Sequence, residues 1–143
     1  MRVIEAGASY ADERFAVEDW ALDELDRVTF ERCAFDECDL RPLTVTGGDW
    51  SFVVARGAKL SGVSLAGVKL RDADLSDADL TRCDLRGADL AGAQLRQAAL
   101  KGADLRGADL SNVRLNEVDL GGVRIDLAQA ALVATSYGAV VEP

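Results

Sequence analysis

The sequence contains no histidine, and its three cysteines form no CxxC pair. Histidine is the side chain that most often acts as an acid or base near neutral pH, and it is also a common ligand of zinc. No GxxxxGK[ST] phosphate-binding loop occurs either. We therefore expect a protein that is not an enzyme and that binds no metal and no cofactor.

The chain also lacks the run of about 18 apolar residues that a membrane-spanning helix requires. Its opening segment, MRVIEAGASYADERF, has no basic stretch followed by an apolar core and so does not resemble a secretory signal. Cys33, Cys38 and Cys83 occupy positions that we expect to be buried, and unpaired cysteines suit a reducing compartment. These features predict a cytoplasmic protein that does not associate with membranes.

A basic surface is missing as well. The chain carries 16 basic and 25 acidic side chains, for a formal net charge of −9. The acidic excess is greatest in residues 1–27, while the remainder mixes both signs. Direct binding to nucleic acid depends on clustered lysine and arginine, so we do not expect it here.

The dominant feature that is present is a period of five residues. Leucine stands at every fifth position from Leu60 through Leu120. A small residue lies two positions before each leucine, aspartate often lies directly before it, and glycine is frequent two positions after it. The segment ADLRGADLAG shows the repeating unit, A-D-L-x-G.

A period of five fits neither common secondary structure. A helix has 3.6 residues per turn, so a leucine at every fifth position would wander around its surface. A strand alternates with period two, so successive leucines would face opposite sides. The pattern is consistent with a chain that turns a corner once per unit and keeps each leucine inside, as stacked repeat proteins do.

The A-D-L-x-G units resemble those of the pentapeptide-repeat family. The resemblance implies an all-β solenoid, a right-handed quadrilateral β-helix in which four pentapeptides form one coil. Applied to this chain, it predicts a non-repeat lead-in at residues 1–12 and a β-helix at 13–127. Residues 13–27 would form an atypical first coil, and residues 28–127 about five regular coils.

The repeat ends after Ile125. Asp126 can cap a helix from Leu127 to about Tyr137, so residues 128–143 are expected to form a C-terminal cap helix and tail. Some relatives pair through C-terminal segments, so the resemblance leaves two roles open, a lid over the last coil or a homodimer contact. The residues assigned to either role are Leu127, Ala131, Leu132, Ala134 and Tyr137.

Residues 41–57 keep the repeat phase but depart most from its composition. Trp50 falls at a central position and Phe52 at a corner. Two interpretations remain: a distorted coil, or an apolar patch formed by Trp50 and Phe52 that binds a partner.

Two functions are consistent with the sequence. The first is a rigid, non-catalytic scaffold that binds a protein partner not identified by the sequence. The alternative comes from the resemblance, because some pentapeptide-repeat proteins mimic DNA, bind DNA gyrase and modulate fluoroquinolone sensitivity. That function would use the most acidic face, which we assign to Glu31, Asp49, Asp89 and Asp109.

Overall fold

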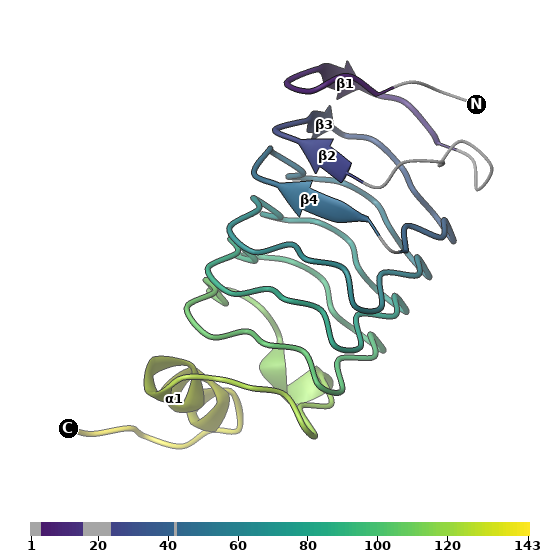
Figure 1. Ribbon diagram of the computed structural model, residues 1–143. Helices are drawn as coiled ribbons and strands as arrows, with labels where there is room; N and C mark the ends of the chain where they lie inside the picture. The colour runs from purple at the N-terminus through teal and green to yellow at the C-terminus, as the bar shows by residue number, and fades with distance from the viewer. Residues whose placement is uncertain (1–3, 16–23, 42) are drawn as a thin grey trace.

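The chain winds in stacked turns from one end of the molecule to the other. The computed structural model describes residues 4–15, 24–41 and 43–143. Figure 1 shows the turns stacked from the N-terminal end towards helix α1 (Leu127–Ser136), which lies at the opposite end. Strand β1 (Ser9–Ala11) pairs in parallel with β3 (Thr29–Glu31), and β2 (Glu24–Asp26) pairs in parallel with β4 (Thr44–Thr46).

Beyond these strands, single-residue parallel bridges continue the same register. Asp49 pairs with Lys69, Lys69 with Asp89, and Asp89 with Asp109, each step spanning twenty residues. Because the sequence unit has five residues, one turn of twenty contains four units, and we call such a turn a coil. Every fourth unit therefore lies on the same face of the stack.

Most units turn their corner in the same way. The N–H of Ala73 donates to the C=O of Leu70 at 3.1 Å, and Asp72 between them has a φ of 56°. A positive φ at the third residue defines a type II β-turn, in which glycine avoids the steric cost of a side chain. This explains why glycine recurs two positions after the leucine.

The aspartate before the leucine supports the same corner. Oδ1 of Asp74 accepts from the N–H of Ser76 at 3.1 Å, and Oδ1 of Asp109 accepts from the N–H of Ser111 at 2.9 Å. These bonds satisfy a corner N–H that the neighbouring coil does not reach. The aspartates of the repeat therefore support its turns.

Central leucines and the small residues beside them fill the interior, as expected from the repeat. Leu70, Leu80 and Leu90 are buried, and so are Ala73 and Ala78. The three cysteines occupy the same kind of position, are buried and form no disulfide bond. They act as small apolar residues in the core.

The N-terminal coils contain an aromatic core in place of leucine. Trp50 contacts the rings of Phe30 and Phe35, with centroid separations of 5.0 and 5.6 Å. The stack continues to Tyr10, whose ring lies 5.6 Å from that of Phe30. Edge-to-face and offset stacking of this kind stabilises large rings beyond the burial of their area.

The stack begins earlier than the sequence predicted. Strand β1 lies within residues 1–12, which were assigned to a non-repeat lead-in, yet Tyr10 pairs in register with Phe30. The repeat was recognisable there, because Ala8 holds the small position two residues before Tyr10. Residues 16–23, part of the predicted atypical first coil, lie outside the described residues.

The last coil is less regular than predicted. A 3₁₀ helix, Leu115–Glu117, replaces one corner, although Leu115 still points into the core. Within residues 43–143, no β-bridge joins Gln94 to Arg114 or Ala99 to Asp119, the pairs that the register would place together. The final coil therefore leaves the ladder on two of its four faces.

Helix α1 closes this end of the stack. Asp126 caps it in a capping box with Gln129, and the Asp126 carboxylate also accepts from the N–H of Gly107 at 2.8 Å. The Gln129 side chain is only 3% exposed, and its amide donates to the C=O of Leu105 and to the C=O of Ala108. Gln129 thus satisfies the Ala108 carbonyl, which a further coil would otherwise bond, and adds a second hydrogen bond to the Leu105 carbonyl, which already accepts from the N–H of Ala108 in its own turn.

Replacing Gln129 with alanine should destabilise the C-terminal end, because the Ala108 carbonyl loses its donor and the Leu105 carbonyl loses one of two. We expect the free energy of unfolding to fall by about 1–3 kcal/mol in urea denaturation. Gln94→Ala serves as the control, since that glutamine is exposed. An equal, small effect of both substitutions would contradict the capping role of Gln129.

Candidate functional site

The predicted acidic face exists as a geometric unit. The bridges from Asp49 through Lys69 and Asp89 to Asp109 place these residues in one column along the stack. Glu31 lies at the corner beside this column, at the end of β3. The structure therefore brings the four predicted carboxylates to one side of the molecule.

Neighbouring cations neutralise part of this face. Nη2 of Arg71 lies 3.2 Å from Oδ2 of Asp89, and Arg32 forms an ion pair with Glu31. The position between Asp49 and Asp89 in the column belongs to Lys69. The face is acidic, but its negative charge is interrupted rather than continuous.

Asp109 is the last carboxylate of this column, and it accepts hydrogen bonds from its own turn. Ser111 donates to its Oδ1 from both the backbone N–H, at 2.9 Å, and the hydroxyl, at 2.6 Å. Hydrogen bonds from Ser111 lower the pKa of Asp109, and the charge of Arg71 lowers it further. Asp109 is thus held ionised at neutral pH.

Trp50 and Phe52 do not form the predicted common patch. Trp50 is only 2% exposed, because its ring is packed against Phe30 and Phe35 in the aromatic core. Phe52 lies at a corner and is 56% exposed. Trp50 is buried, as its central position in the repeat predicts, so the interpretation of a patch shared with Phe52 is wrong, and Phe52 is the member of the pair that a partner can reach.

Phe52 forms one wall of a groove with a volume of about 470 Å³. The groove lies between the coil that contains β3 and the coil that contains Asp49. Its lining combines apolar and charged side chains. Its lining residues are Thr29, Phe30, Glu31, Arg32, Asp49, Ser51 and Phe52.

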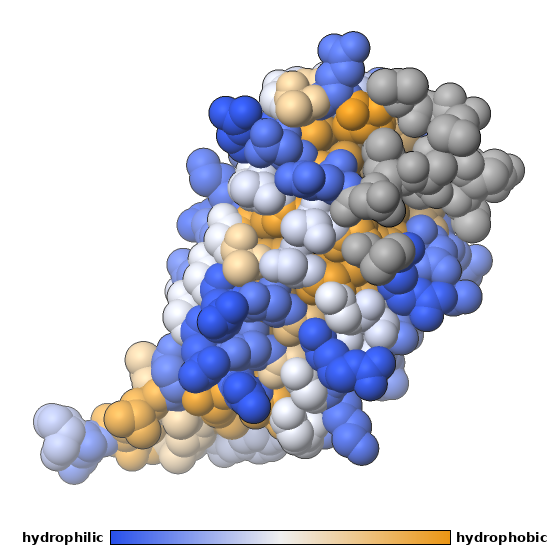
Figure 2. All heavy atoms as spheres, viewed as in Figure 1, coloured by the Kyte–Doolittle hydropathy of each residue, from blue (hydrophilic) through white to orange (hydrophobic). Residues whose placement is uncertain are grey.

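The C-terminal residues assigned to a cap or a dimer divide into two groups. Leu127 is 91% exposed, and Leu132 and Tyr137 are exposed as well. Ala131 and Ala134 are partly buried. Figure 2 shows hydrophobic residues gathered along this C-terminal segment. Leu127 therefore does not serve as a lid; the lid is Gln129, which apolar patterning could not reveal because glutamine is polar.

Short-range ion pairs neutralise several carboxylates on the other faces. Bidentate pairs join Asp84 to Arg86 and Asp104 to Arg106, each with two N–O distances of 2.9 Å or less. Asp74 is only 6% exposed, and Nε of Arg56 donates to it at 2.6 Å.

The part of the chain that the structure describes offers neither a cluster of metal ligands nor a membrane-spanning helix. It contains no group of three or more histidine, cysteine, aspartate or glutamate side chains placed to hold a metal ion. None of its helices is long and apolar enough to span a bilayer. The features that its surface does present are turn hydrogen bonds, ion pairs and grooves.

The aspartates at the corners should make the free energy of unfolding depend on pH in the acidic range. Hydrogen bonds from Arg106 lower the pKa of Asp104 to about 2, and those from Arg86 lower the pKa of Asp84. Unfolding returns these pKa values to about 3.9, so the unfolded chain binds more protons at low pH. The stabilisation is complete above about pH 5 and is lost as the pH falls through about 4 towards 2.

Urea midpoints measured from pH 2 to pH 8 test this dependence. We expect a plateau between pH 5 and pH 8, where no histidine titrates, and a decline below it. Asp104→Asn keeps the side-chain oxygen that accepts from Arg106 but removes the charge, so its decline should be shallower. A midpoint that changed mainly between pH 5 and pH 8 would contradict this assignment.

The sequence matches a family model described as pentapeptide repeats, in eight copies over residues 51–87 and 88–126. Among curated proteins there is no match.

Several solved structures are similar to this chain. One is a pentapeptide repeat protein from the Arabidopsis thaliana thylakoid lumen, at 28% identity over 72% of this chain and 75% of that chain, with a TM-score of 0.53. Another is Rfr23 from the cyanobacterium Cyanothece 51142, at 20% identity over 85% and 83%, with a TM-score of 0.51. A third is full-length QnrB1, a plasmid-mediated fluoroquinolone resistance protein, at 16% identity over 94% and 99%, with a TM-score of 0.40. The similarity to pentapeptide repeat structures implies a right-handed β-helix.

Proposed function

The chain belongs to the pentapeptide repeat family, and on that premise we propose that it is a rigid, non-catalytic scaffold that binds a partner protein. Proteins of this family generally serve as structural or interaction scaffolds. The full fold that we infer is the quadrilateral form of the β-helix, whose corners carry the side chains available to a partner. Three buried thiols that form no disulfide support a cytoplasmic location.

The observation that carries the proposal is the conformation of Phe52. Its φ is 62°, in the left-handed region that bulky side chains rarely adopt. It is the one apolar side chain among the described non-glycine residues with positive φ, since all the others are Asp, Arg, Glu, Gln or Asn.

Burial of the Phe52 ring within its own chain does little to offset this strain. A left-handed conformation costs roughly 1–2 kcal/mol for a residue with a side chain, and the ring remains more than half exposed. Glycine occupies the equivalent corner in many other units and would serve the turn better. An exposed aromatic ring beside a groove is the usual form of an anchor in a protein interface.

The test is Phe52→Gly. Removal of the strained side chain should leave the melting temperature unchanged or slightly raised, while capture of partner proteins from a lysate of the source cells, quantified by mass spectrometry, should be lost. Loss of the fold in Phe52→Gly would instead assign the ring a structural role, and unchanged capture would contradict a docking role.

Asn112→Gly is the matched control. Asn112 also has a positive φ and occupies the same corner position, three coils along the stack. It carries no aromatic ring, so the same substitution should leave partner capture intact.

A second candidate function is binding to DNA gyrase as a mimic of DNA. The supporting observation is the column that contains Asp49, Asp89 and Asp109 on one face. Carboxylates repeated along a rigid rod can present negative charge to a surface that binds DNA. The Arg71–Asp89 ion pair weakens this face, so we rank the candidate second.

A gyrase supercoiling assay, with and without ciprofloxacin, tests the second candidate. A mimic should inhibit supercoiling or relieve drug-induced cleavage, and a double variant, Asp89→Asn with Asp109→Asn, should lose the effect while keeping the turn-supporting oxygens. The control pair is Asp77→Asn with Glu37→Gln, which removes two charges from a different corner. No effect of the unmodified protein would exclude this candidate.

We also propose that two copies pair through the C-terminal segment. The exposed apolar side chains of Leu127, Leu132 and Tyr137 support this contact. Light scattering coupled to size-exclusion chromatography should give the mass of a dimer, and Leu132→Asp should shift it to that of a monomer. A monomeric mass for the unmodified chain at high concentration would contradict the proposal.

A further inference from the structure

A second groove lies near the C-terminal end of the stack and differs in charge from the chain as a whole. Its volume is about 490 Å³. The charged residues that line it are four arginines and two aspartates, which leaves a local charge of +2 in a chain whose net charge is −9. The arginines are Arg82, Arg86, Arg106 and Arg124, and we call the site the arginine groove.

The two central arginines are fixed in position. Nε and Nη2 of Arg86 donate to the Asp84 carboxylate at 2.9 and 2.8 Å, and Nε and Nη2 of Arg106 donate to Asp104 at 2.9 and 2.6 Å. A guanidinium has five N–H donors, and each carboxylate engages two of them. Each central arginine therefore keeps donors for a further acceptor, on a side chain that is already ordered.

The two remaining arginines lack such carboxylate partners among the described residues. Neither Arg82 nor Arg124 forms an ion pair within 4.0 Å with any residue in the part of the chain that the structure describes. Hydrogen bonds from the N–H and the hydroxyl of Thr81 to Oδ1 lower the pKa of Asp79, and the charge of Arg82 lowers it further. Arg82 and Arg124 are thus available to an anion from outside the chain.

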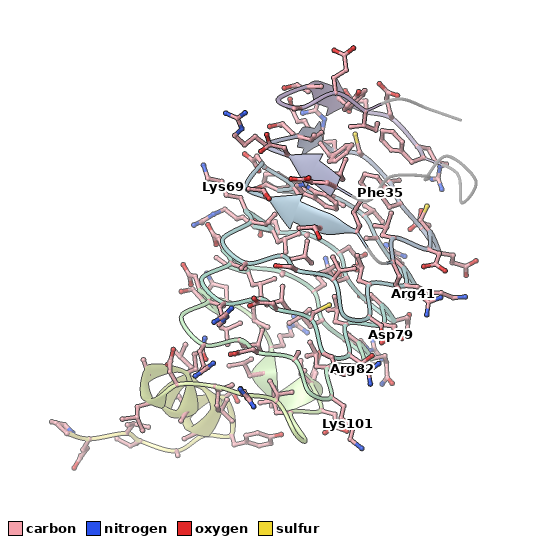
Figure 3. All side chains as sticks on the ribbon, in the orientation of Figure 1. Phe35, Arg41, Lys69, Asp79, Arg82 and Lys101 are labelled. Atoms are coloured by element: carbon pink, nitrogen blue, oxygen red, sulfur yellow. The ribbon has the colours of Figure 1, made fainter. Side chains whose placement is uncertain are left out.

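Glycines in the floor of the groove make room for these cations. A Cβ at residue 102 would lie 3.0 Å from Cγ of Arg82, so the arginine stem lies across the glycine backbone. Lys101 lies over Gly122 in the same way, with its Cγ 3.6 Å from the position of such a Cβ. Figure 3 shows Arg82 and Lys101 along the same edge of the stack.

We propose that the arginine groove binds a phosphoryl oxyanion, either a free phosphate compound or the phosphorylated side chain of another protein. Arginine matches the geometry of phosphate oxygens with paired N–H donors and is weakly hydrated, so it is the preferred residue for such contacts. Asp84 and Asp104 orient the central arginines, and Arg82 and Arg124 supply the uncompensated charge. The site is independent of the Phe52 groove, and either proposal can fail without the other.

The test is an NMR titration of the full chain with sodium pyrophosphate at constant ionic strength. We expect saturable shifts of the amide signals of Gly102 and Gly122 and of the side-chain Nε–H signals of the groove arginines. Arg82→Ala and Arg124→Ala should each weaken binding by about tenfold, as expected for the loss of a charge-assisted hydrogen bond. Arg96→Ala removes the same charge from another face and should change the affinity less than about twofold.

A parallel titration with a phosphoserine peptide and its unphosphorylated counterpart distinguishes the two sources. Binding of pyrophosphate assigns the groove to a free phosphate compound, and binding of the phosphopeptide alone assigns it to a phosphorylated side chain. Absence of saturable shifts with both probes would overturn the proposal. An equal loss of affinity in Arg96→Ala would overturn it as well, since binding would then reflect general charge.

Discussion

The structure depends on one hydrogen bond that is repeated along every face of the stack. Up to the last coil, where Leu95 and Leu100 do not continue the pattern, the N–H of a central residue donates to a carbonyl nineteen positions later, as in Leu70 to Asp89 at 2.8 Å and Leu85 to Asp104 at 2.9 Å. Each face contributes a bridge of one residue in most coils, so no face is stable by itself. Stability comes from stacking on neighbours, and the bond forms only if every coil has the same length. This requirement explains why the five-residue unit is kept without insertion.

Much of the interior could be predicted from the sequence, because the ladder constrains it tightly. The leucine positions, the small residues beside them and the turn-supporting aspartates follow from the repeat itself. The ends could not be predicted equally well. Tyr10 was assigned to a lead-in although it belongs to a coil, and Gln129 was overlooked because a cap is made by hydrogen bonds, which hydropathy does not encode.

The outer surface is less constrained, and there the sequence was a weaker guide. A count of charges by face identified the acidic column, but the direct ion pair between Arg71 and Asp89, which lie on the same face in adjacent coils, depends on side-chain conformation. Trp50 and Phe52 are two residues apart and chemically alike, yet one fills the core and the other is exposed. The position within the unit, rather than hydrophobicity, decides which side chains can meet a partner.

The central claim, that a fixed register of twenty residues holds the stack together, is tested most directly by deletion. Removal of residues 68–87 takes out one complete coil and joins Gly67 to Ala88 in phase. This variant should keep the β-rich circular dichroism spectrum and unfold cooperatively at a somewhat lower temperature. Removal of residues 68–85 shifts the phase by two residues and should abolish cooperative unfolding. Equal behaviour of the two deletions would contradict the account.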